Sequence, residues 1–70
     1  MKTSYKKLWK LLIDKDMSKA DLHKAAGLSS STMTKLRHSE DVSMSALRKI
    51  CMVLNCNISD IVEFVSDEEQ

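Results

Sequence analysis

The chain has 70 residues, of which 43% are hydrophobic and 30% are charged, and its formal net charge is +1. This length allows one domain at most, and this composition is typical of a folded chain, not of a disordered one. No apolar run is long enough to cross a bilayer, and no secretory signal pattern opens the sequence. Two cysteines without such a signal favour free thiols in a reducing compartment, so we expect a cytoplasmic protein.

Charge is divided unevenly along the chain. Residues 1–38 carry nine Lys and Arg against three Asp, a net charge of +6, whereas residues 39–70 carry two against seven acidic residues, a net charge of −5. A basic segment of this kind can bind an anionic partner such as nucleic acid. The alternative is that Lys6, Lys7 and Lys10 only solvate the outer face of a helix, and charge alone favours neither interpretation.

The first predicted helix covers residues 4–14, with Ser4 as the expected N-cap. Its apolar stripe follows the i, i+3, i+4, i+7 spacing: Tyr5, Leu8, Trp9 and Leu12. A second helix is predicted over residues 19–26, because Ser18 and Asp21 can form a capping box at its start. Gly27, the only glycine in the chain, can adopt the left-handed conformation that ends a helix.

A third helix is predicted over residues 30–38, with Ser29 as its N-cap. Met33 and Leu36 share one side and are expected to point inward. The opposite side then carries Ser30, Ser31, Thr34, Lys35 and His38. This outward side has no carboxylate and no large apolar group, so the helix can approach another surface closely.

Two further helices are predicted over residues 44–54 and 58–65. Ser43 caps the first of them, which has a core stripe of Leu47, Ile50, Cys51 and Leu54. Asn57, with Asp60 at the box position, caps the second. A strand is the alternative for the last segment, because Ile61, Val62, Phe64 and Val65 are β-branched or aromatic. The sequence therefore predicts an all-α, five-helix domain in residues 1–65 and an acidic disordered tail in residues 66–70.

The order of these signals resembles that of the phage-repressor (Xre/Cro-type) helix-turn-helix family. The matching stretches are MSKADLHKAAGLSSSTMTKL and VSMSALRKICMVLNCNISDI, and the resemblance covers residues 4–65. In this family a serine opens the second helix, a glycine makes the turn, and a serine opens the recognition helix. The resemblance implies a lambda-repressor-like bundle whose third helix reads the major groove of double-stranded DNA.

The resemblance also implies two groups of DNA-contacting residues. The candidates for base contacts are Ser30, Ser31 and Lys35, with Thr34 on the same side of the helix. The candidates for phosphate contacts are Ser18, Lys19, Ser29, Arg37 and His38. Many members pair an arginine of the first helix with a glutamate near the end of the third, and the nearest positions here are Leu12 and Arg37. We therefore expect this buried pair to be absent, which leaves Arg37 free to contact a phosphate.

The sequence departs from the family at two other places. His23 stands where the family usually has alanine between the second and third helices, and the loop after the third helix contains Glu40 and Asp41 where many members are basic. The acidic loop weakens the expected binding by a monomer. Because each monomer also offers few cationic contacts, we expect a homodimer on a two-fold site with half-sites roughly 10 bp apart. The last helix, through Val62, Phe64 and Val65, is the expected interface.

Nothing in the sequence indicates catalysis: it has no glycine-rich phosphate loop, no metal-binding motif and no histidine at motif spacing from a nucleophile. We expect no enzyme activity, no cofactor, no metal site and no small-molecule substrate. The leading hypothesis is a small sequence-specific DNA-binding transcriptional regulator. The alternative, suggested by the acidic loop and the modest net charge, is a protein-interaction module on the same fold, such as an antitoxin-like or accessory subunit.

Overall fold

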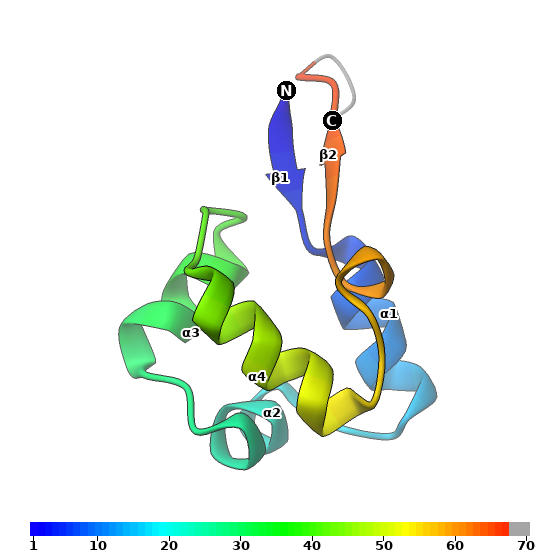
Figure 1. Ribbon diagram of the computed structural model, residues 1–70, viewed down its shortest axis with the longest axis vertical. Helices are drawn as coiled ribbons and strands as arrows, with labels where there is room; N and C mark the ends of the chain where they lie inside the picture. The colour runs from blue at the N-terminus through cyan, green and yellow to red at the C-terminus, as the bar shows by residue number, and fades with distance from the viewer. Residues whose placement is uncertain (68–70) are drawn as a thin grey trace.

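The computed structural model describes residues 1–67 (Figure 1). The elements in chain order are β1 (Lys2–Ser4), α1 (Lys6–Asp14), α2 (Lys19–Ala26), α3 (Ser30–Arg37), α4 (Met44–Leu54), the 3-10 turn η1 (Ile58–Asp60) and β2 (Glu63–Val65). Figure 1 shows α4 across the middle of the molecule, with α1 on one side and α3 on the other. The two strands form an antiparallel sheet that stands above the helices as a short arm.

The core lies between the helices. Each of α1, α2, α3 and α4 contributes a fully buried side chain, and one more comes from the residue after η1: Leu8, Leu22, Leu36, Ile50 and Ile61. The helices themselves are too short to be stable in isolation, so this shared apolar contact holds them in place. Tyr5, at the start of α1, is also buried, whereas Trp9 is partly exposed and packs against the core.

The predicted helix boundaries are confirmed where a local cap defines them. The Ser18 hydroxyl accepts a hydrogen bond from the Asp21 amide, and the Asp21 carboxylate accepts one from the Ser18 amide, both at 3.0 Å. The Ser29 and Ser43 hydroxyls cap α3 and α4 by accepting from the amides of Thr32 and Ala46, without a reciprocal bond from a side chain. Gly27 ends α2 with φ of 64°, in the left-handed region.

The predicted fifth helix, residues 58–65, is wrong. Asn57 and Asp60 do form the expected capping box, but the helix lasts only for the single turn η1. The chain then becomes strand β2, in which Glu63, Phe64 and Val65 pair with the first strand. The β-branched and aromatic side chains fit a strand, so the fold is mostly helical with a small sheet, not all-α.

The first helix is also shorter than predicted. It begins at Lys6, because Ser4 belongs to β1 and is buried in the sheet rather than capping the helix. The Ser4 hydroxyl still accepts a 3.4 Å hydrogen bond from the Lys6 amide. The third helix ends at Arg37, with His38 as its C-cap.

The predicted tail, residues 66–70, lies mostly outside the described residues. Within it, the Asp67 carboxylate is 3.6 Å from the N-terminal amine of Met1. Along residues 1–67, none of the helices has the length and hydropathy needed to cross a membrane.

Candidate nucleic-acid interface

The two sides of α3 differ as the sequence predicts. Met33 is 3% exposed and Leu36 is fully buried, so this side belongs to the core. The candidates for base contacts all lie on the exposed surface: Ser30, Ser31, Thr34 and Lys35. The structure therefore brings these four side chains together on the solvent side of one short helix, and Figure 1 shows this helix at the margin of the molecule.

Hydrogen bonds within α3 already orient part of this surface. The Ser29 hydroxyl, besides capping the helix, donates to the Thr32 hydroxyl at 2.9 Å and lies 3.2 Å from the Ser31 hydroxyl. The Thr34 hydroxyl donates to the Ser30 carbonyl oxygen at 3.0 Å and accepts from the Arg37 guanidinium at 3.4 Å. Thr34 and Ser31 are thus held by their own helix.

The candidates for phosphate contacts are exposed as well: Ser18, Lys19, Ser29, Arg37 and His38. Ser18 and Ser29 mark the N-termini of α2 and α3, where free backbone amides and the helix dipole favour an anion. Asp21 adds a negative charge near the first of these ends. Hydrogen bonding to Ser18, first to its backbone amide and then to its side chain, holds the pKa of the Asp21 carboxyl below its usual value. The Asp21 carboxylate therefore stays ionised beside Ser18.

Sequence reasoning named Lys19 as a candidate but missed the contact that its side chain makes. Its ammonium lies 4.3 Å from the centroid of the Trp9 ring, in a cation–π arrangement between α2 and α1. No spacing rule predicts this contact, because the two residues belong to different helices. The contact limits the freedom of a side chain that we expect at the DNA backbone.

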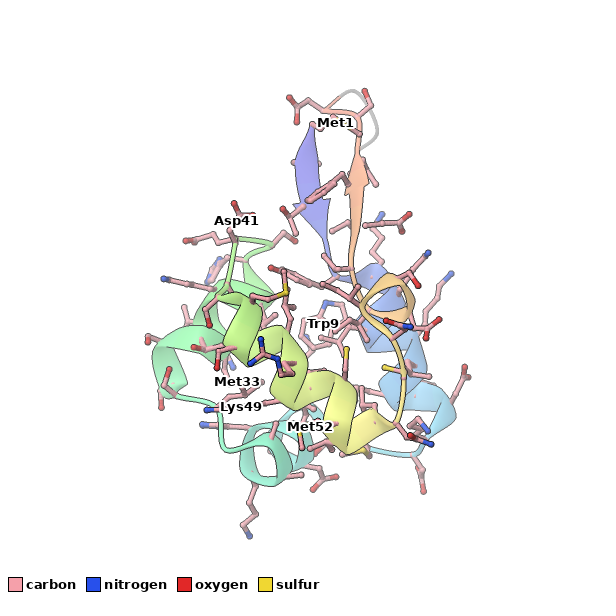
Figure 2. The ribbon with its side chains drawn as sticks, viewed as in Figure 1. Met1, Trp9, Met33, Asp41, Lys49 and Met52 are labelled. Carbon is pink, nitrogen blue, oxygen red and sulfur yellow. The ribbon has the colours of Figure 1, made fainter. Side chains whose placement is uncertain are left out.

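The loop after α3 is tied to the start of the chain, which sequence reasoning also missed. The Tyr5 hydroxyl donates to the Glu40 carbonyl oxygen at 2.7 Å, and the Thr3 hydroxyl donates to the Asp41 carboxylate at 2.6 Å. Burial, and secondarily the negative charge of Asp41, raise the pKa of the Tyr5 hydroxyl above its usual value. Figure 2 shows Asp41 on this loop, near the base of the two-stranded arm.

The positions that depart from the family have different environments. His23 is half-buried on α2. Leu12 is buried in the core, whereas Arg37 remains on the surface of α3 and donates to Thr34.

The two cysteines are free thiols, and both are half-buried. Burial, together with the neighbouring Cys51 thiol, raises the pKa of Cys56 to about 11. Within residues 1–67 no cluster of three potential metal ligands occurs.

Comparisons with known proteins agree with this geometry. The chain is similar to the transcriptional regulator VanUg in its form II crystal structure, with a TM-score of 0.92 and 50% sequence identity over 94% of this chain and 88% of that one. A search of the curated proteins found no match. The model of the Cro/C1-type helix-turn-helix DNA-binding domain matches residues 7–67, which is most of the sequence. The chain therefore belongs to the Cro/C1-type helix-turn-helix family of DNA-binding domains.

Proposed function

We propose that this protein is a sequence-specific transcriptional regulator that occupies operator DNA with α3 in the major groove. One observation carries the proposal: the exposed side of α3 bears only small hydroxyl groups and flexible cations, opposite the buried Met33 and Leu36. A helix enters the major groove when its leading side is small or flexible and offers hydrogen-bonding groups. The similarity to a solved transcriptional regulator supports the same role.

Lys35 is the best candidate for reading a base. A lysine ammonium pairs with the acceptor edge of guanine, whereas a serine hydroxyl can donate or accept and so serves several bases. Ser30 and Ser31 lie one turn earlier on the same exposed side, and Thr34 directly precedes Lys35. We assign base contacts to these four residues, with Lys35 contributing most of the sequence discrimination.

The phosphate contacts are assigned to the surrounding residues. Ser18 and Ser29 would bring the amide ends of α2 and α3 to the backbone, with Lys19, Arg37 and His38 adding positive charge. These few cations per copy favour two copies on a two-fold operator, with half-sites roughly 10 bp apart.

The proposal is tested by selecting bound sequences from random DNA and titrating salt for three variants. Lys35→Ala should weaken operator binding by about 1–3 kcal/mol and relax the preference at one base position. Lys19→Ala should weaken all sequences alike and reduce the salt slope by about 1. Lys10→Ala is the matched control. It removes the same charge from the exposed surface of α1, which lies on the other side of α4 from α3.

Two results would contradict this assignment in different ways. An unchanged base preference in Lys35→Ala would remove that residue from the reading surface. Absence of binding to mixed DNA even at low salt, with a protein partner co-purifying, would favour the protein-interaction module instead.

A further inference from the structure

Each of the helices α1 to α4 ends in the same kind of backbone turn. One residue of the turn has a positive φ, and the amide of the next residue donates to the carbonyl oxygen five positions before it. In turns of this kind the side chains at the two hydrogen-bonded positions commonly contact each other. The pairs at these positions are Leu12 and Met17, His23 and Leu28, Lys35 and Glu40, and Cys51 and Cys56.

The turn after α1 shows how this geometry places side chains. Leu12 is buried, and Met17 is partly buried and packs against the same core. Both line one hollow on the surface. The turn after α4 has the same hydrogen bond, but thiols stand at both of its paired positions.

The turn after α4 holds Cys51 and Cys56 close together. Asn55 has φ of 52°, and the Cys56 amide is 3.1 Å from the Cys51 carbonyl oxygen. With standard bond lengths, a contact this short keeps the two Cα atoms within about 7 Å, the outer limit for a disulfide. Both side chains are half-buried against the core, and the Cys51 thiol acts on Cys56 through charge and a hydrogen bond. The two thiols are therefore neighbours.

We propose that Cys51 and Cys56 form a dithiol site that a low-molecular-weight disulfide oxidises to a disulfide within the chain. In the first step, the thiolate of one cysteine attacks the small disulfide, forms a mixed disulfide and expels one small thiol. In the second step, the thiolate of the other cysteine attacks the mixed disulfide at the protein sulfur and expels the second small thiol. The two protein thiols lose two electrons and two protons, and the small disulfide gains them as two thiols. An excess of small thiol reverses both steps.

The surroundings of the pair suit an anionic co-reactant such as oxidised glutathione. Cys51 lines a groove that contains the exposed Arg48. Cys56 lines a separate hollow in which three basic side chains outnumber two acidic ones: Lys7, Lys10, Lys15, Asp14 and Asp60. This excess of positive charge favours the approach of carboxylates. The pKa of Cys56, about 11, slows the steps that use its thiolate, but the closing step occurs within one chain and needs no second encounter.

The dithiol site is separate from the candidate DNA surface. None of the residues assigned to base or phosphate contacts lines the groove of Cys51 or the hollow of Cys56. The inference therefore goes beyond the proposed function and does not rest on it. The oxidation is measurable without DNA.

The test is equilibration of the full chain with mixtures of reduced and oxidised glutathione at pH 8, followed by acid quenching and mass spectrometry. The wild-type chain should lose two hydrogen atoms and stay a single chain. No lysine or arginine lies between Cys51 and Cys56, so one tryptic peptide contains both and locates the bond. In the same mixture, the ratio of oxidised to reduced chain should be about tenfold higher for the folded chain than in urea. Oxidation should correspondingly raise Tm.

A matched control moves one thiol by a single position. In the variant with Cys51→Ser and Met52→Cys, the two thiols are closer along the sequence, but position 52 is 75% exposed and is not paired by the turn. The folded variant should give a ratio of oxidised to reduced chain about tenfold below that of the wild type. Cys51→Ser and Cys56→Ser alone should each stop at the mixed disulfide with glutathione. Circular dichroism confirms that each variant is folded.

Three outcomes would overturn the inference. The first is a folded wild-type chain that oxidises no further than the chain in urea. The second is a wild-type chain that accumulates the mixed disulfide, or a bond between two chains, in place of the internal bond. The third is a variant with the moved cysteine that oxidises as readily as the wild type. DNA binding by the reduced chain tests the proposed function separately, so the two proposals fail independently.

Discussion

Replacing Tyr5 with Phe removes one hydrogen bond between the start of α1 and the loop after α3. The Tyr5 side chain is 2% exposed, and its hydroxyl is 2.7 Å from the Glu40 carbonyl oxygen. The phenyl ring of the variant still fills the core, so the loss is the net value of the hydrogen bond. We expect the free energy of unfolding to fall by about 1 kcal/mol, which in a domain of this size lowers Tm by roughly 4–8 °C.

The assay is urea unfolding followed by Trp9 fluorescence. The slope with urea should be unchanged, because the variant alters stability and not the surface exposed on unfolding. Thr3→Val is the control: it removes the neighbouring hydrogen bond to the exposed Asp41 and should cost less than about 0.5 kcal/mol.

The pH dependence supplies a second readout of the same contact. Because the folded-state pKa of Tyr5 is raised above its usual value of 10.0, the unfolded chain loses this proton first. The stabilisation of the folded state by the Tyr5 hydroxyl is therefore complete below pH 10.0 and is lost as the pH rises through the higher pKa of the folded state. The stability advantage of the wild type over Tyr5→Phe should shrink in this range. Equal stability of the two proteins at neutral pH would refute the reasoning.

Two further predictions concern single residues. Gly27→Ala should destabilise the fold by about 1 kcal/mol. The cause is backbone strain alone, since φ is +64° and an added Cβ meets nothing within 4 Å. Thermal unfolding measures the loss of stability, which should be smaller for Gly27→Asn. Cys56, with a pKa of about 11, should be alkylated slowly at pH 8, where roughly one thiol in a thousand is ionised. The alkylation rate, followed by mass spectrometry, should rise until the pH passes that pKa. Alkylation of Cys56 at pH 8 as fast as in the urea-unfolded chain would contradict its burial.

The helices could be predicted because their signals are local. Ser18, Ser29 and Ser43 cap helices through bonds to amides three residues ahead, and Gly27 ends a helix by its own backbone freedom. Such contacts are encoded within a few neighbouring residues. The outward side of α3 followed from the same spacing, because fixing the buried Met33 and Leu36 fixes what lies opposite.

The C-terminal segment could not be predicted in this way. The capping box of Asn57 and Asp60 forms, but it does not determine how many residues follow it as a helix. The β-branched and aromatic residues made a strand the alternative, but no local pattern shows that Lys2–Ser4 is the strand with which this segment pairs. The same holds for Lys19 over Trp9 and for Tyr5 against Glu40, which adjust the candidate site across distant parts of the chain.

The pairing of Lys2–Ser4 with Glu63–Val65 gives this small protein an order of assembly. During synthesis Lys2–Ser4 is made before the helices, and Glu63–Val65, with which it pairs, is made after them. Closing this long loop adds an entropic cost that the helices, which are completed from neighbouring residues, do not bear. The helical body can therefore assemble first. The small sheet is therefore completed only after α4 has been made.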